Sequence, residues 1–481
     1  MIKTSKLLSV MVVAALAWTG TACDRNLTSI NTNPNGPVSV APPSILPDAI
    51  QSAASNIWGT FQGIKMGLVW DQQVSEIQYP DEDRYIIRPN STSGMWGLYS
   101  GGLVNAQAIV DQGVSTKTPN WEAVGLIMKS WMFGILTDYM GDIPYSQALK
   151  GASNVAPAYD KQQAVYTGIF ADLAKAAQEI APSGLGFPSG DLLYGGDMTK
   201  WKKFAYSLML RDAIHLSKAD PTTGAKEAQA AIAGGVFQSN DDNATLNYTA
   251  ANPNPIYSDH WIGGRDDYGM SATLVDTLKA LNDPRLPIYA QPTPADPTVY
   301  AGRPPGLISG PPNANVSRIG ALWREQPNAP IVWESYAEVL FIEAEAAQRG
   351  WIAGSPASLY AQAITASMQQ YGIPQAQIDA YLAQPRVQFN PATALTQIAL
   401  QKWIALFMNG EEGFTEVRRT GVPHLLPGPD ARLSAIPLRI PYPDDEAKLN
   451  ATSYDAAMTA QGLSPTASYL VTMAQPVWWD K

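Results

Sequence analysis

The chain has a single cysteine, Cys23, among its 481 residues. A disulfide framework, which stabilises many small secreted domains, is therefore excluded. Histidine is almost as scarce: His215, His260 and His424 lie far apart, and no His-Glu-x-x-His or paired Cys/His spacing occurs. The usual sequence pattern of a zinc site is thus missing, and we expect neither a metal ion nor another cofactor.

Charge is also sparse, because charged residues make up only 15% of the chain and the net charge is −10. No cluster of Lys or Arg occurs, which argues against nucleic acid as a partner. No later apolar run approaches the roughly 20 residues that a transmembrane helix needs. The motifs of serine hydrolases, phosphate-binding loops and dinucleotide-binding folds are missing as well, so no common enzyme class is indicated.

The first residues have the pattern of an export signal. Lys3 and Lys6 precede an apolar run over residues 7–18, and Gly-Thr-Ala-Cys follows at 20–23. A basic head, a short apolar core and a small-residue cleavage site predict a secretory signal peptide over residues 1–22. Its end resembles the lipobox of bacterial lipoproteins, with Cys23 at the lipidated position and Gly20 where Leu is usual. We therefore predict a lipid anchor at Cys23; an ordinary signal peptide with a chance cysteine is the alternative.

Beyond Cys23 the composition changes twice. Residues 23–44 are rich in Asn, Pro, Thr and Ser and predict a flexible tether. From residue 45 onward apolar residues recur at helical spacing, which predicts a single α-helical domain over 45–481. The clearest helical patterns fall at 124–135, 333–344 and 400–408, and weaker ones near 45–59, 61–78, 95–112, 160–181, 199–218, 271–282 and 356–371. Short connections between them favour antiparallel helix pairs.

Long loops rich in aromatic residues interrupt the helices at 236–270 and 283–332, and a polar stretch covers 78–90. Loops of this length in a compact protein are usually functional. Their rings can stack on sugar C–H faces while Asp and Arg bind hydroxyls; the alternative is that each ring only packs its own loop. The candidate ligand residues are Tyr79, Asp83, Arg84, Tyr85, Trp261, Arg265, Asp266, Tyr268 and Trp323.

Several motifs, taken in order, resemble the SusD/RagB family of outer-membrane lipoproteins. They are Asp-Tyr-Met-Gly-Asp-Ile-Pro-Tyr at 138–145, Asp-Pro-Arg-Leu at 283–286, Tyr-Ala-Glu-Val-Leu-Phe-Ile-Glu-Ala-Glu-Ala at 336–346, Gln-Lys-Trp-Ile-Ala-Leu at 401–406, Arg-Arg-Thr-Gly at 418–421, and Arg-Ile-Pro-Tyr-Pro at 439–443. The resemblance extends from about residue 93 to the end of the sequence. Its closest counterpart is the SusD-like branch described as starch-binding and associated with the outer membrane.

This resemblance implies an all-α fold of degenerate tetratricopeptide-like helix pairs with the ligand site on irregular loops. It implies a non-catalytic lipoprotein of the outer membrane, facing the cell exterior. Such a protein captures glycans and delivers them to a partner, a SusC-like TonB-dependent transporter. Two alternatives remain open: the cargo is peptide, or the chain is a secreted glycoside hydrolase, which would need a pair of carboxylates in one pocket.

The motif residues themselves are expected to be structural. In the helix predicted over 333–349, Glu345 and Arg349 have the i, i+4 spacing of an ion pair. Glu338 and Glu343 lie off the apolar series and are expected to hold buried partners such as Arg418 or Arg419, because a buried carboxylate needs a donor. Gly141 to Pro144 is expected to form a turn that ends a helix, since proline cannot continue it.

Overall fold

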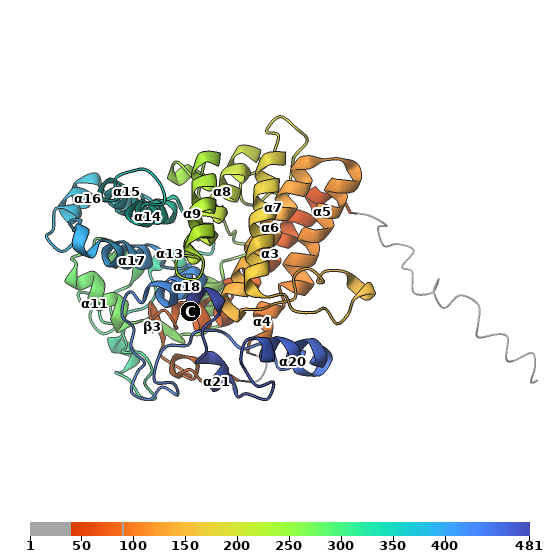
Figure 1. The fold of residues 1–481 in the computed structure, drawn as a ribbon. Helices are drawn as coiled ribbons and strands as arrows, with labels where there is room; N and C mark the ends of the chain where they lie inside the picture. Colours follow the sequence, from red (N-terminus) through yellow and green to blue (C-terminus); the bar gives the residue numbers. More distant parts are fainter. Residues whose placement is uncertain (1–39, 89–90) are drawn as a thin grey trace, which may run out of the picture. The chain divides into compact units, whose positions relative to one another are not determined.

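Residues 40–88 and 91–481 are described by the structure, a computed structural model in which α-helices dominate (Figure 1). The predicted signal peptide, Cys23 and most of the predicted tether lie outside these residues. Helix α3 (Pro42–Ile57) starts before residue 45, where the sequence analysis placed the end of the tether. The early start is possible because proline is tolerated in the first turn of a helix.

A row of long helices stands side by side in Figure 1. They are α5 (Val104–Thr116), α6 (Pro119–Met140), α7 (Gln162–Glu179), α8 (Met198–His215) and α9 (Pro221–Gly234), and each packs on the next in the chain. A second group pairs α14 (Tyr336–Gln348) with α15 (Pro356–Gln369), and α17 (Ala394–Ala405) also packs on α14. The all-α prediction is confirmed, and these consecutive pairs are consistent with a tetratricopeptide-like scaffold. Within the described ranges, no helix combines the length and apolarity of a membrane span.

Side-chain caps set several helix starts. The Asp197 carboxylate accepts from the backbone N–H of Thr199 and Lys200 at the start of α8, and the Ser335 hydroxyl accepts from Glu338 N–H at the start of α14. Such caps satisfy backbone donors that have no partner inside the helix. At the other end of α6, Gly141 adopts a φ of 86°, which a residue with a side chain rarely takes. The predicted turn after α6 is thereby confirmed.

Two small antiparallel sheets join segments distant in sequence. β1 (Val74–Glu76) pairs with β3 (Tyr268–Met270), and β2 (Ala244–Leu246) pairs with β4 (Ile331–Glu334). Two helix predictions were wrong here over part of their length. The segment 61–78 is a π-helix, η1 (Thr60–Leu68), followed by β1, and residues 333–334 belong to β4. Strand pairing with distant residues overrides the local helical pattern in both places.

Shorter elements fill the remaining chain. The short α-helices are α4 (Ser93–Trp96), α10 (Pro255–Tyr257), α11 (Ala272–Ala280), α12 (Leu286–Tyr289), α13 (Ala321–Arg324), α16 (Gln375–Leu382), α18 (Gly410–Thr420), α19 (Glu446–Leu449), α20 (Ala451–Ala460) and α21 (Tyr469–Met473). The π turns are η3 (Tyr99–Leu103) and η6 (Ser258–Ile262), and the 3₁₀ turns are η2 (Glu82–Arg84), η4 (Gly151–Ser153), η5 (Asn240–Asp242), η7 (Asn313–Asn315), η8 (Pro391–Thr393) and η9 (Trp478–Asp480). Helices α9, α16, α18 and α20 were not predicted. The stretches 236–270 and 283–332 hold only short elements, as expected.

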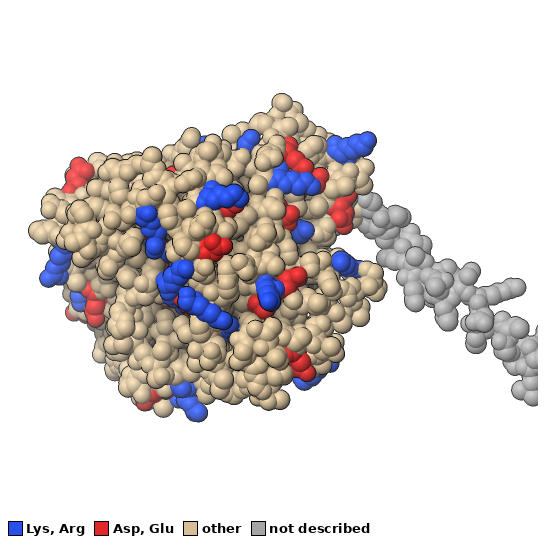
Figure 2. Space-filling model, viewed as in Figure 1, with Lys and Arg blue, Asp and Glu red and all other residues tan. Residues whose placement is uncertain are grey.

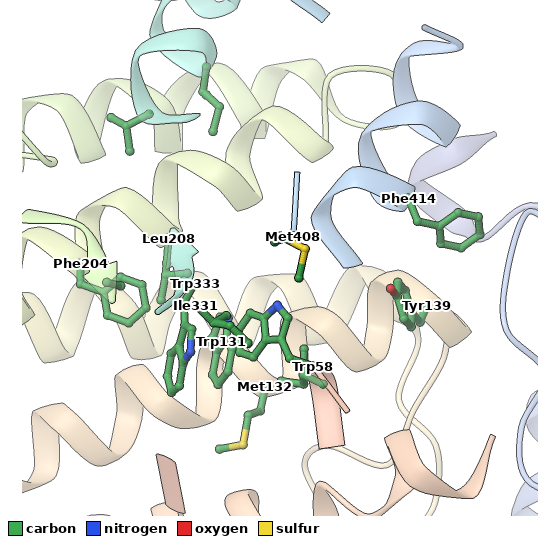
Figure 3. Close-up of a cluster of buried hydrophobic side chains, with 14 of the residues drawn as sticks. Trp58, Trp131, Met132, Tyr139, Phe204, Leu208, Ile331, Trp333, Met408 and Phe414 are labelled. Atoms are coloured by element: carbon green, nitrogen blue, oxygen red, sulfur yellow. The ribbon is translucent and has the colours of Figure 1, made fainter. Parts of the chain in front are cut away.

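Three buried tryptophans tie the helical layers together (Figure 3). Trp131 of α6 stacks on Trp333 of β4 with ring centroids 4.0 Å apart, and Trp58 lies 5.7 Å and 5.6 Å from them. Offset stacking of this kind adds about 0.5–1.5 kcal/mol per pair beyond the burial of the rings. The stack fixes β4, and therefore the β2–β4 sheet, against the helix row.

A buried ion network lies where α8, α14, α17 and α18 meet. Arg211 binds Glu338 at 2.7 Å, and Arg419 binds Glu345 at 2.6 Å. The predicted Glu345–Arg349 pair is confirmed, with nitrogen and oxygen 2.9 Å apart. The prediction that Arg418 or Arg419 pairs with Glu338 was wrong. Arg419 binds Glu345, whereas Glu338 binds Arg211 of α8.

The prediction of a buried basic partner for Glu343 was wrong. Among the described residues, the ion pairs of α14 are made by Glu338 and Glu345, and no basic side chain pairs with Glu343. Burial raises the pKa of Glu343 to about 7. Glu343 is half-buried. Without a basic partner, this burial favours the neutral carboxylic acid over the charged carboxylate.

Candidate functional site

The β1–β3 pairing brings two of the predicted loop regions together. Glu76 lies opposite Tyr268, so the chain leaving β1 runs beside the chain that enters β3. The backbone N–H of Ile77 donates to the carbonyl of Asp267 at 2.7 Å, and the Gln78 amide donates to the carbonyl of Asp266 at 3.2 Å. Residues 78–90 and 236–270 therefore meet at one surface, as a shared binding site requires.

Two exposed aromatic rings mark this surface. Tyr79 is 61% exposed and Trp261, on η6, is 56% exposed. The Arg265 guanidinium lies 5.7 Å from the centre of the Tyr79 ring, and Trp261 lies 4.9 Å from His260 and 6.5 Å from Tyr257. We call Tyr79, Tyr257, His260, Trp261 and Arg265 the aromatic platform. Exposed aromatic rings that lie together in one patch are typical of binding surfaces, whereas single exposed rings are common on any protein.

Ion pairs beneath the platform hold it in place. Asp266 accepts from Arg318 at 2.7 and 2.8 Å and from Arg324 at 3.0 Å, while Arg265 pairs with Asp267. Burial disfavours the charge of Asp266, but the two guanidinium groups outweigh it and hold its pKa below the ordinary value. Asp266 is therefore an ionised structural group.

The space under the platform is small. A cavity of about 20 Å³ lies between Tyr268, His260, Arg324 and Asp266, and the Tyr268 hydroxyl donates to the carbonyl of Thr60 at 3.1 Å. This volume suits at most a water molecule. A larger ligand at this surface must therefore bind on its outer face, along Tyr79 and Trp261.

The structure removes three predicted residues from this surface. Tyr85 is 2% exposed and packs edge-on against Trp70, and Asp83 is buried with its pKa raised to about 7 by burial. Trp323 is 3% exposed and packs against Tyr371. These three residues therefore do not belong to the exposed platform, because loop aromatics and acids here also fix the loops to the body.

The other predicted residues lie on or beside the platform. Tyr79, Trp261 and Arg265 form part of it, Asp266 lies under it, and Tyr268 is half-buried behind it. Arg84 points elsewhere and donates to the carbonyl of Asp430 at 3.2 Å. Sequence reasoning missed Tyr257, His260 and Arg324. The aromatic composition of 236–270 could have indicated the first two, but nothing in the sequence connects Arg324 with Asp266.

Among the described residues, one group has the composition of a metal site. His215, Glu412 and Glu416 place their ligand atoms within 4.8 Å of one another. All three are buried and already bound: His215 to Asp138 at 3.2 Å, Glu412 to Lys402 at 3.2 Å, and Glu416 to Arg419 at 2.7 Å. Because cations of the protein itself neutralise these acids, the cluster is a structural ion network.

One face of the molecule carries few charges, and these are of both signs. On the face drawn in Figure 2, Lys and Arg alternate with Asp and Glu among a majority of uncharged residues. Such a face offers no extended field for a polyanion. A neutral ligand fits it better.

Comparison with known protein families gives one match. A family model described as "Starch-binding associating with outer membrane" (SusD-like) matches residues 34–443. A comparison with curated proteins gave no match.

Solved structures give the same fold. A chitin-binding protein shares 31% identity at a TM-score of 0.79, over 92% of this chain and 100% of that one. A chitin-binding SusD homologue from Flavobacterium johnsoniae shares 26% identity at a TM-score of 0.79, over 90% and 98% of the two chains. A SusD homologue from Bacteroides fragilis shares 25% identity at a TM-score of 0.78, over 92% and 100%. The chain therefore belongs to the SusD-like family of starch-binding proteins associated with the outer membrane.

Proposed function

We propose that this chain is a non-catalytic lipoprotein of the outer membrane that captures neutral glycans on the aromatic platform. The observation that carries the proposal is the pair of exposed rings, Tyr79 and Trp261, mounted on a frame of ion pairs. A rigid ring offers contact area to a sugar face at little cost in conformational entropy. Chitin oligosaccharides and starch are the first ligands to test, since related proteins carry those names.

The charges near the platform support capture over hydrolysis. Glycoside hydrolysis needs one carboxylic acid that gives a proton and a second carboxylate that attacks or activates water. Here Asp266 is bound by two arginines, and Asp267 is bound by Arg265. Both groups are committed to holding the loop, which leaves them unsuited to either role.

Delivery to a partner completes the proposal. The predicted lipid anchor at Cys23 would hold the chain on the outer membrane, facing the cell exterior, and a SusC-like TonB-dependent transporter would receive the glycan. The family description, which associates such proteins with the outer membrane, supports this placement. Co-purification of a TonB-dependent barrel with the tagged chain from native membranes would support it; recovery of the chain without any barrel would count against it.

Substitution of the platform tests the capture site. Trp261→Ala should lower the affinity for the bound oligosaccharide by about tenfold or more, because a stacking ring at the centre of a site acts as a hot spot. Isothermal titration with chitin and malto-oligosaccharides measures this directly.

The matched control is Tyr469→Ala, which removes another partly exposed ring, 37% exposed, on α21. It should leave the affinity unchanged. Equal affinity in the Trp261→Ala variant and the native chain would contradict the platform, and binding of peptide digests alone would replace glycan by peptide as the cargo.

A further inference from the structure

A second pocket opens beside α13, away from the aromatic platform. Trp323 and Arg324 are neighbours on α13, yet Arg324 reaches Asp266 while Trp323 packs against Phe407 with ring centroids 5.2 Å apart. The two side chains therefore leave the helix in different directions. The Trp323 side lines a pocket of about 220 Å³ between the β2–β4 sheet and the segment that joins α17 to α18.

The pocket has a buried floor and an accessible mouth. Its floor includes Trp323, Phe407 and Asn409, all buried, whereas Val332 and Thr245 at its rim are partly exposed. Pockets for drug-sized ligands measure about 300–1,000 Å³, so this one suits a smaller molecule. A single sugar ring is of the right size class.

One wall of the pocket is aromatic and rigid. The Trp323 ring meets Phe407 at 78° and Tyr371 at 73°, with the Tyr371 ring centroid 6.0 Å away. Edge-to-face contacts of this kind hold each ring in one orientation. The wall can therefore present ring faces without losing side-chain freedom when a ligand binds.

A buried acceptor at the pocket has no partner. Asn409 is 6% exposed, and its Oδ1 has no hydrogen-bond partner in the part of the chain that the structure describes. Its amide nitrogen donates to the carbonyl of Trp333 at 3.2 Å, which fixes the orientation of the group. Asn409 is the N-cap residue of α18. Asparagine at this position normally accepts a hydrogen bond from the first turn of the helix, but the Asn409 side chain makes no such bond. A buried polar atom left unpaired is unfavourable, so a hydroxyl donor placed there would stabilise it.

The backbone beside this acceptor is strained. Met408, which precedes Asn409 and also lines the pocket, has a φ of 74°. A non-glycine residue is strained in this region and stays there only when the surrounding structure holds it. The conformation places Asn409 at the pocket wall.

The lining favours a neutral ligand. Glu338 is the one ionisable acid among the lining residues, and Arg211 donates to both of its oxygens at 2.7 and 2.8 Å. A charged ligand would enter without a free counter-ion and lose its hydration. Aromatic walls and amide groups instead match the C–H faces and hydroxyls of a neutral sugar.

We propose that this pocket, formed by Trp323, Phe407 and Asn409, binds a single neutral sugar ring separately from the aromatic platform. The choice of a sugar rests on the proposed function, whereas the size and neutrality follow from the pocket itself. Asn409 Oδ1 accepts a hydrogen bond from a sugar hydroxyl, and the ring lies against Trp323. Such a site would let the protein hold one end or branch of a glycan while the platform holds the chain.

Ligand-observed NMR on the purified full chain tests the proposal. The probes are N-acetylglucosamine and glucose, with glucuronate as the charged comparison, each at about 10 mM so that binding in the millimolar range is detected. Val332→Trp, on the half-buried rim of β4, should fill the mouth and reduce the monosaccharide signal by about tenfold. Asn409→Ala should weaken binding by about tenfold through the lost hydrogen bond while leaving α18 uncapped as before.

Two controls separate the pocket from the platform. Val155→Trp makes the same change at an exposed position and should leave the signal unchanged. Trp261→Ala should keep the monosaccharide signal while it lowers oligosaccharide affinity. Circular dichroism and melting confirm that each variant is folded.

The contradicting outcomes are distinct for the two sites. An equal monosaccharide signal in Val332→Trp and the native chain, or equal binding of glucuronate and glucose, would overturn the pocket. A native chain that binds oligosaccharides but gives no monosaccharide signal would overturn the pocket and leave the proposed function intact. A monosaccharide signal lost in Trp261→Ala alone would assign that binding to the platform.

Discussion

At the scale of single residues, the buried ion network shows how a few charged side chains stabilise a chain that is poor in charge. Arg211 lies within 3.8 Å of Glu334 and Glu412 as well as binding Glu338 at 2.7 Å. The acids outweigh the burial penalty on the guanidinium and raise the pKa of Arg211 further. One arginine therefore lies within 3.8 Å of acids from three segments of the chain.

Removal of this arginine should be costly. Arg211→Met leaves buried acids without a counter-ion and should lower the free energy of unfolding by about 3–5 kcal/mol. Arg349→Met is the matched control: it removes a guanidinium from Glu345, which keeps Arg419 at 2.6 Å, and should cost less than about 1 kcal/mol. Urea denaturation of both variants measures the difference, and equal destabilisation would show that the network contributes little.

His215 makes the same network sensitive to pH. Burial disfavours its charge, but Glu412 and Asp138 outweigh this and raise its pKa from 6.5 to about 10. A group whose pKa rises on folding stabilises the folded state fully below its unfolded pKa and loses that contribution as pH rises through the folded value. Stability should therefore fall between about pH 6.5 and 10.

Asp212, whose pKa burial raises to about 8, contributes a fall in the same direction, so the native chain alone cannot isolate His215. His215→Gln removes the histidine contribution and should flatten the dependence of the melting temperature on pH, most clearly above pH 8, where Asp212 has already ionised. Identical pH profiles for the variant and the native chain would disprove the role of His215.

At the scale of elements, the β1–β3 pair is what assembles the platform. Gly269, in β3, has no room for a side chain: an added Cβ would lie 2.7 Å from Val316 Cγ1 and 2.8 Å from Ile77 Cγ2. The close approach lets β1, β3 and the 316–317 segment lie together beneath Tyr79 and Arg265.

Substitution of this glycine tests the element. Gly269→Ala should cost about 1–3 kcal/mol by overpacking and should lower oligosaccharide affinity by shifting the platform. The control is Gly134→Ala in α6, where the added Cβ would meet only Asp212 Oδ1 at 3.7 Å. That change should be neutral or stabilise by up to about 1 kcal/mol, because alanine favours helix over glycine. Thermal melting and titration of both variants would decide; a silent Gly269→Ala would show that the strands have room to move.

Periodicity predicted the long helices because their apolar faces are local features of the sequence. The predicted segment 160–181 contains α7, and 199–218 contains nearly all of α8. Periodicity failed where a segment pairs with a part of the chain that is distant in sequence. Trp333 fits a helical series with residues 336–344, but it lies in β4, which pairs with β2, 85 to 90 residues earlier in the chain. Helix α18 was missed because its buried face is lined with charged residues, Glu411 to Arg419, in place of an apolar stripe.

The same limit applies to the site. Aromatic composition led to the loops that carry the exposed rings of Trp261 and Tyr79. It could not separate these from Trp323 and Tyr85, whose rings face inward, since burial of a loop residue depends on contacts with distant segments. Arg324 was not predicted for the same reason, because its partner, Asp266, lies in another loop.

At the scale of the whole molecule, a helical scaffold carries two separate surfaces of different depth. The platform is shallow and mounted on ion pairs, while the pocket beside Trp323 is deeper and lined by aromatic and amide groups. A shallow site would suit the proposed transfer of cargo to a partner, because its ligand can dissociate readily. The predicted lipid anchor would place both surfaces at the outer membrane.

The most direct test of this account is titration of the purified chain with chitin and malto-oligosaccharides, followed by a reducing-end assay of the same samples. The account predicts saturable binding of at least one neutral oligosaccharide with a Kd between about 1 μM and 1 mM, and no new reducing ends. Release of new reducing ends, or the absence of binding to every neutral oligosaccharide tested, would contradict non-catalytic glycan capture.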